Sequence, residues 1–124
     1  MDPVPARVLL VEDDRRARTS IARLLRKRGY QVTLCDGVRS ACDQLAHADF
    51  DAVITDFWMA DGTGSDVIAA ARRRTPPIAA VVVTAAPPSI HDLQVPCLVK
   101  PLGADELLPV VAALVEDTRE RRTT

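Results

Sequence analysis

Five short, mostly apolar runs recur along the chain, separated by stretches of amphipathic or loop-like sequence. The first run, at residues 8–11, reads Val-Leu-Leu-Val and contains no polar position. A short continuous apolar run is typical of a strand that is buried on both faces of a parallel sheet. Similar runs predict four more strands, at residues 32–35, 52–55, 79–83 and 97–99.

Four further segments carry apolar residues at the spacing of an amphipathic helix, at about residues 15–28, 38–48, 66–74 and 104–116. Strands that alternate with helices imply right-handed crossovers and a parallel sheet that helices cover on both faces. The sequence therefore predicts an α/β fold with a doubly wound, five-stranded parallel sheet. Pro109 lies inside the last helix, where we expect a kink or a broken first turn.

The length of 124 residues is that of a single domain. We expect its core over about residues 7–116 and a frayed polar tail over residues 117–124. The net charge of −1 favours neither a nucleic acid nor a membrane surface as a partner. Basic side chains crowd residues 15–28, a pattern that favours a solvated helix face over a binding patch. We expect a cytoplasmic protein, because no apolar run has the length of a membrane span and residues 1–7 lack the apolar region of a signal peptide.

The three cysteines, Cys35, Cys42 and Cys97, have no CxxC spacing. With two histidines far apart in the sequence, a zinc site is not expected. We expect free, buried thiols in a reducing compartment. Direct binding to nucleic acid is also not expected, because no helix-turn-helix domain follows.

Polar residues follow four of the predicted strands at their carboxyl ends. In a doubly wound sheet, ligands bind beyond the carboxyl ends of the strands. We therefore expect these side chains to meet at one edge of the sheet. They are the acidic triplet Glu12, Asp13 and Asp14 after the first strand, Asp56 after the third, Thr84 at the end of the fourth and Lys100 after the fifth.

Carboxylates that converge in one crevice repel one another. Each pair costs about 4 kcal/mol at about 4 Å and an effective dielectric constant of about 20. A hard divalent cation offsets this repulsion, and Mg²⁺ commonly combines carboxylates with water and phosphate oxygens. Lys100 adds a positive charge that can hold a phosphate oxygen, and Thr84 adds a neutral donor. Such groups stabilise a phosphoryl group during transfer, and a carboxylate can accept it.

Each of these residues also has a simpler interpretation. Asp13 or Asp14 could cap the helix that begins at Arg15. Thr84 could be an ordinary strand end, and Lys100 a surface charge. Their ordered occurrence at the ends of four strands favours the functional interpretation.

Residues 7–115 resemble the CheY-like receiver domains of response regulators. The resemblance rests on Glu12-Asp13 after the first strand, Asp56 after the third, Thr84 after the fourth, Lys100-Pro101 after the fifth, and Gly64 eight residues past Asp56. It implies the flavodoxin-like strand order 2-1-3-4-5 and a phosphoacceptor function in a two-component phosphorelay.

The resemblance also implies roles for the matched residues. Asp56 would accept a phosphoryl group from the histidine of a kinase and would bind Mg²⁺. Asp13 would bind the metal directly, Glu12 directly or through water, and Trp58 through its backbone carbonyl.

Thr84 would bind a phosphoryl oxygen and shift on activation, and Lys100 would pair with the phosphoryl group. The Lys100–Pro101 bond is commonly cis in this family. The implied partners are a histidine kinase or phosphotransfer protein and a downstream output protein or domain. Such a module catalyses its own phosphorylation and dephosphorylation only, and is not a turnover enzyme.

Three features depart from the family pattern. Ala60 stands where proline is usual. Cys97 stands at the switch position that an aromatic residue usually occupies, and a small thiol cannot swing as a ring does. Residues 85–95 are short for a helical crossover, and Pro87-Pro88 disfavour a helix there, so we expect the fourth helix to be shortened or absent.

Two other functions remain open. Asp61-Gly62-Thr63 is similar to part of the DxDGT signature of haloacid dehalogenase hydrolases, but Met59 stands where that signature needs its first acid. A receiver-like module could also act through protein interaction without phosphate, which Cys97 and the short crossover favour and the intact acids disfavour.

Overall fold

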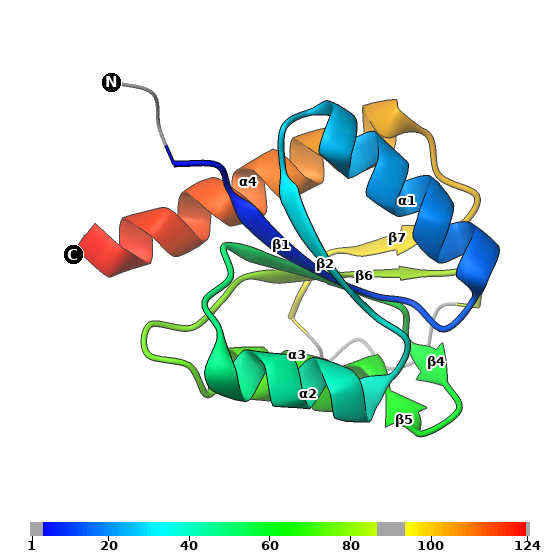
Figure 1. Cartoon of the computed structure of the whole chain (residues 1–124), viewed down its shortest axis with the longest axis horizontal. Coiled ribbons are helices and arrows are strands. Elements are labelled where there is room, and N and C mark those ends of the chain that lie inside the picture. The colour runs from blue at the N-terminus through cyan, green and yellow to red at the C-terminus, as the bar shows by residue number, and fades with distance from the viewer. Residues whose placement is uncertain (1–3, 87–93, 124) are drawn as a thin grey trace.

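The computed structural model describes residues 4–86 and 94–123. Its main sheet has five parallel strands in the order β2-β1-β3-β6-β7 (Figure 1). These strands are β1 (Arg7–Val11), β2 (Gln31–Cys35), β3 (Ala52–Thr55), β6 (Ala80–Thr84) and β7 (Cys97–Val99). Counted among the parallel strands alone, this is the order 2-1-3-4-5, so the predicted α/β fold is confirmed.

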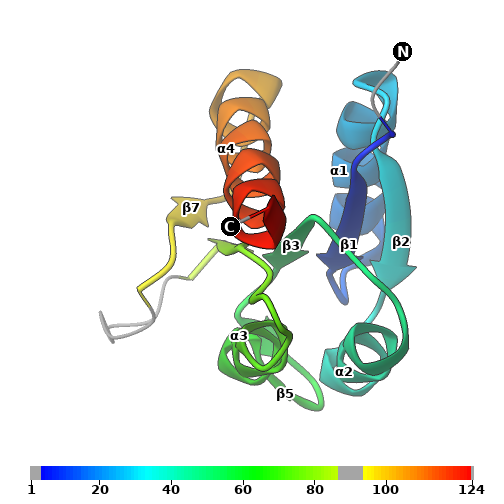
Figure 2. The ribbon, with the colours of Figure 1, turned by 90° about the vertical axis from the view of Figure 1, so that its left-hand side faces the viewer.

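Helices cover both faces of this sheet (Figure 2). α1 (Arg15–Lys27) and α4 (Ala104–Thr123) lie on one face, and α2 (Val38–His47) and α3 (Gly64–Arg72) lie on the other. Successive strand residues point to opposite faces. Leu9 therefore packs toward α2 and α3, and Leu10 toward α1 and α4, so the apolar runs fill two separate cores.

The prediction of a frayed polar tail is wrong, because α4 continues to Thr123. Thr118 is fully buried, and its hydroxyl accepts a hydrogen bond from the backbone N–H of Ala79 at 3.0 Å. Arg119 and Arg122 bind the buried carboxylate of Asp51. These contacts hold the last helical turns against the amino-terminal edge of the sheet.

Of the kink or broken first turn expected at Pro109, the break is not found, since α4 runs through this residue without interruption, and the kink stays a prediction. Pro109 is exposed and lies near the start of the helix. Its missing N–H costs one hydrogen bond to the carbonyl of Asp105, a residue that is itself exposed.

A short hairpin follows β3, in a stretch where the sequence predicted neither a strand nor a helix. Its strands are β4 (Trp58–Met59) and β5 (Gly62–Thr63). The turn residue Asp61 accepts hydrogen bonds from the backbone N–H groups of Val38 and Arg39, at 2.9 and 3.0 Å. Asp61 therefore caps α2, whose own N-cap residue has no side chain. This capping role explains Asp61 without a hydrolase active site.

The predicted shortening of the fourth helix falls mainly on residues 87–93, which lie outside the described residues. Between β6 and β7, residues 85–86 and 94–96 contain no helix.

The Lys100–Pro101 bond is cis, as expected. Of the free thiols, Cys35 is buried, but Cys42 is half-buried and Cys97 is exposed, so the prediction of buried thiols is wrong for Cys97 because edge strand β7 is open to solvent. Among the described residues, no helix combines the length and apolar character that a membrane span requires.

Candidate functional site

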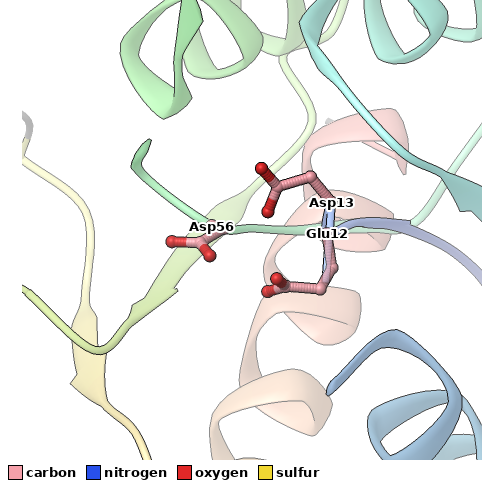
Figure 3. A group of neighbouring side chains, drawn as sticks. All are labelled: Glu12, Asp13 and Asp56. Carbon is pink, nitrogen blue, oxygen red and sulfur yellow. The ribbon is translucent and has the colours of Figure 1, made fainter. Parts of the chain in front are cut away.

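Three carboxylates converge where β1 and β3 end (Figure 3). Val11 pairs with Thr55 in the sheet, so the residues that follow these two, Glu12 and Asp56, lie side by side. The Asp56 N–H donates to the Val11 carbonyl at 2.9 Å, which extends the ladder by one residue. Carboxylate oxygens of Glu12, Asp13 and Asp56 lie within 4.8 Å of one another. This grouping of hard oxygen donors suits a divalent cation such as Mg²⁺.

Lys100 joins two of these acids. Its Nζ lies 2.5 Å from Glu12 Oε2 and 3.1 Å from Asp56 Oδ2. The backbone N–H of Lys100 donates to the backbone carbonyl of Thr84 at 3.0 Å, and this bond holds the lysine beside the end of β6. One ammonium therefore faces two carboxylates, while Asp13 remains exposed beside them.

Burial and these contacts change the protonation of the site. Burial raises the pKa of Glu12, because its carboxylate loses hydration, and the hydrogen bond from Lys100 limits this rise. For Lys100, burial opposes the charged form, but the bonds to Glu12 and Asp56 outweigh it and raise the pKa of the ammonium. Lys100 therefore stays positively charged at neutral pH.

The Asp56 carboxylate is held in place from two sides. Oδ1 accepts the backbone N–H of Phe57 at 2.6 Å, and Oδ2 accepts Lys100. Gly64 passes very close to this residue, since an added Cβ there would lie 2.7 Å from the Asp56 carbonyl oxygen and 3.2 Å from the Phe57 Cα. A side chain at residue 64 would therefore displace the backbone that carries the carboxylate.

Asp14 serves a different purpose from its two acidic neighbours. It is the N-cap of α1, and its Oδ2 accepts the backbone N–H of Ala17 at 2.9 Å. The simpler capping interpretation is therefore confirmed for Asp14, and the acid cluster consists of Glu12, Asp13 and Asp56.

Thr84 ends β6 at the same edge of the sheet and is buried. Its Oγ1 accepts the backbone N–H of Ala86 at 3.4 Å. Cys97 pairs with Val82 in edge strand β7, two residues before the Thr84 level. The switch roles of Thr84 and Cys97 stay predictions.

Trp58 has a contact that sequence reasoning missed. Only its backbone carbonyl was assigned a role, yet its indole Nε1–H donates to the Ala86 carbonyl at 2.6 Å. No sequence signal could have found this bond, because it joins a side chain to the backbone of a loop 28 residues away.

The comparisons with known proteins agree with this geometry. The response regulator receiver domain family matches residues 8–112. The chain is 41% identical over 64 residues to the response regulator MprA of Mycolicibacterium vanbaalenii, a match that covers 52% of this chain and 28% of that protein. The chain thus matches less than a third of this relative's length.

Solved structures are similar over nearly the whole chain. The CheY-like receiver domain protein of Methanospirillum hungatei JF-1 has a TM-score of 0.85 at 18% identity, with 94% of this chain and 98% of that chain covered. The receiver domain of the sensor histidine kinase PA1611 from Pseudomonas aeruginosa PAO1 has a TM-score of 0.79 at 24% identity, with 91% and 99% covered. That structure has a magnesium ion coordinated in its active site cleft.

The family match extends from β1 into α4 and includes the acid cluster, Thr84 and Lys100. Receiver domains are signalling modules of two-component systems rather than turnover enzymes. The chain belongs to the response regulator receiver domain family.

Proposed function

We propose that this domain is a phosphoacceptor in a two-component phosphorelay and that Asp56 takes the phosphoryl group. The observation that carries the proposal is the meeting of Glu12, Asp13 and Asp56 within 4.8 Å, with Lys100 bonded to two of them. Such a surplus of negative charge is costly unless a cation offsets it, and a bound cation can in turn hold the oxygens of a phosphoryl group.

In the proposed reaction, a carboxylate oxygen of Asp56 attacks the phosphorus of a phosphohistidine on a kinase or phosphotransfer protein. A phosphorus–oxygen bond forms, the phosphorus–nitrogen bond breaks, and the imidazole leaves with the electron pair and takes up a proton. Lys100 pairs with a phosphoryl oxygen, and the Thr84 hydroxyl donates to another. Both groups are at the required edge of the sheet.

The residues present fit a Mg²⁺ ion. Asp13 and Asp56 would hold it directly, Glu12 directly or through water, and Trp58 through its backbone carbonyl. The bound ion would offset the charge of the acids and of the phosphoryl oxygens. The magnesium in the similar receiver domain of PA1611 supports this choice of metal.

The cognate kinase or phosphotransfer protein and the output protein or domain are partners that this function requires. A two-component relay of this type places the domain in the cytoplasm. Phosphorylation adds about −1.5 to −2 charge if the acyl phosphate behaves like the common phosphoresidues. This added charge would shift the domain between inactive and active states.

Incubation with acetyl phosphate and Mg²⁺, followed by intact mass measurement, tests the proposal. The wild-type protein should gain one acid-labile phosphoryl group, and Asp56→Asn should gain none. Asp43→Asn is the matched control, because Asp43 is an exposed acid on α2 and the chemical change is the same. Labelling of Asp56→Asn at the wild-type level would refute the assignment, and an unlabelled wild type would favour a phosphate-independent interaction module.

A further inference from the structure

Positive charge is concentrated on α1 and is not balanced there. Residues 15–35 hold seven of the 16 basic residues and none of the 17 acidic ones. Within residues 4–86 and 94–123, no basic side chain of α1 makes a salt bridge, whereas Arg119 and Arg122 of α4 pair with Asp51. The net charge of −1 therefore combines a positive helix with an otherwise negative chain.

This arrangement is unfavourable for the domain on its own. Arg23 has Arg26 and Lys27 at positions i+3 and i+4, and like charges at these spacings repel each other. Arg15 and Arg16 lie in the first turn, where the helix dipole disfavours positive charge. The dipole favours Arg26 and Lys27 in the last turn, but it does not account for the others. A solvated helix face commonly carries both signs of charge, so the excess indicates a negatively charged partner.

A groove lies beside these charges. β2 is an edge strand of the sheet, and α1 lies against it (Figure 2). The groove between them has a volume of about 510 Å³ and is lined by Thr19, Ala22, Arg23, Arg26, Lys27 and Leu34. Leu34 is 41% exposed, which is unusual for a large apolar side chain in this structure. One side of the groove is therefore apolar and the other is positive, a combination for which a solvated helix face alone does not account.

The basic side chains of the groove are available to a ligand. Arg23, Arg26 and Lys27 are all exposed. Arg26 reaches only the Val32 carbonyl of β2, at 3.4 Å, which is a weak bond. A carboxylate would give this guanidinium a charge-assisted hydrogen bond, which is stronger.

We propose that the groove between α1 and β2 docks an acidic amphipathic helix of a partner protein. Its carboxylates would bind Arg23, Arg26 and Lys27, and an apolar side chain would pack on Leu34. Because the basic residues recur at helical spacing, a helix that lies along α1 would present its acids at the same spacing. The groove does not include the acid cluster, so this proposal does not depend on the proposed function of Asp56.

The distribution of charge favours a short acidic segment over a longer polyanion. Asp13 and Asp14 precede α1, and Asp36 follows β2, so acids border the groove at the carboxyl edge of the sheet. A DNA duplex or an anionic membrane would extend past the basic residues and meet these acids. A helix of a few turns would not, and a phosphate backbone offers no apolar partner for Leu34.

A synthetic peptide can serve as the probe. It would have about 15 residues, near the minimum for an isolated helix, with glutamates and leucines on one face. Fluorescence anisotropy would measure its binding to the whole chain at low ionic strength. The same peptide with glutamine in place of glutamate should bind about tenfold more weakly, because several ion pairs are lost. Added salt should weaken binding of the acidic peptide.

Two variants test the two sides of the groove. Arg23→Glu should weaken binding about three- to tenfold, because it removes one attraction and adds one repulsion. Its control is Arg73→Glu, which reverses an exposed charge at the C-cap of α3 on the opposite face of the sheet. Leu34→Thr keeps a good strand former and should weaken binding about two- to fivefold. Its control is Val99→Thr on the other edge strand, where the side chain is similarly exposed.

Arg23→Glu should remain folded, because the new carboxylate would face Arg26 and Lys27 at favourable spacings. Equal affinities of folded Arg23→Glu and Arg73→Glu for the acidic peptide would overturn the proposal. It would also be overturned if wild type bound the acidic and glutamine peptides equally. A duplex oligonucleotide or anionic vesicles that bind through Arg23, without binding of the acidic peptide, would replace it with a nucleic-acid or membrane site.

The two proposals fail in different ways. Asp56→Asn should bind the acidic peptide as wild type does, and loss of binding in this folded variant would contradict a separate groove. Failure of acetyl phosphate to label Asp56 would overturn the proposed function alone.

Discussion

Asp51 and Asp56 lie at opposite ends of β3, and both are largely buried, but their surroundings differ in charge. Asp51 accepts the Arg7 N–H at 2.8 Å and pairs with Arg119 at 3.3 Å and Arg122 at 2.6 Å. The two arginines more than balance the negative charge of Asp51. Asp56 shares one lysine with Glu12 and has Asp13 beside it, so its end of the strand carries unbalanced negative charge.

This difference separates a structural acid from the proposed phosphoacceptor. A buried carboxylate that is paired with arginines of the same chain needs no bound cation, and its ion pairs hold segments of the fold together. A carboxylate that lies beside other carboxylates is destabilising unless a cation offsets the repulsion. Burial alone does not distinguish these two residues, whereas the balance of charge does.

Removal of the Asp51 charge tests the structural half of this comparison and should have the largest effect on stability. Asp51→Asn leaves Arg119 and Arg122 with a neutral partner. We expect a loss of about 2 kcal/mol in the free energy of unfolding, less than the about 3–5 kcal/mol of a fully buried pair, because the arginines are partly exposed. Urea denaturation would measure it, with Asp43→Asn as the control.

Acetyl phosphate labelling of Asp51→Asn should remain at the wild-type level under conditions where the variant is folded. A loss of labelling in the folded variant, or a stability like that of the control, would contradict the division of roles between the two ends of β3.

The effect of Asp51 should depend on pH in a defined direction. Burial opposes ionisation of this carboxyl, but the Arg7 N–H and the two arginines outweigh it and lower its pKa below the ordinary value of 3.8. A lowered pKa in the folded state means stability that is present above the ordinary value and is lost as the pH falls through the folded value. The stability difference between wild type and Asp51→Asn should therefore be widest near neutral pH and should narrow below 3.8. A gap that widens with acid would show that the arginines do not stabilise the ionised form.

Removal of the Asp13 carboxylate, which lies beside Asp56, should change the stability in the opposite direction and by a smaller amount. Asp13→Ala relieves repulsion, so we expect the metal-free protein to gain roughly 0.5 kcal/mol in unfolding free energy. The same change should weaken Mg²⁺ binding. Thermal melts over a range of Mg²⁺ concentrations would measure both effects.

The neighbouring variant Asp14→Ala is the control for Asp13→Ala. It removes the N-cap of α1 and should lose about 1 kcal/mol while keeping its Mg²⁺ affinity. Unchanged Mg²⁺ affinity in Asp13→Ala would remove this residue from the metal site.

The strands and the acidic edge of the sheet were predictable because local sequence determines them. Apolar runs fix which segments are buried in the sheet, and the register then brings the residues after β1 and β3 together. Glu12, Asp56 and Lys100 could be placed at one edge without knowledge of any side-chain contact. The roles assigned to them remain predictions.

The parts that were missed depend on contacts between distant segments. The last turns of α4 have polar sequence, and they are held by Asp51, 68 residues from Arg119. The β4–β5 hairpin has strands of only two residues, too short for any periodicity to indicate them. The exposure of Cys97 follows from the position of β7 at the edge of the sheet, and its apolar sequence does not reveal this.

The burial of the sheet on both faces has a consequence for how the sequence can diversify. Leu9 and Leu10 are adjacent in the chain but face different helices across a layer of backbone. Substitutions in the two cores have few shared neighbours, so their effects on stability should add. One helical layer can therefore change its sequence, and with it the surface shown to a partner, without compensating changes in the other. The acids at the edge belong to neither core, which leaves the same chemistry available to domains with quite different outer surfaces.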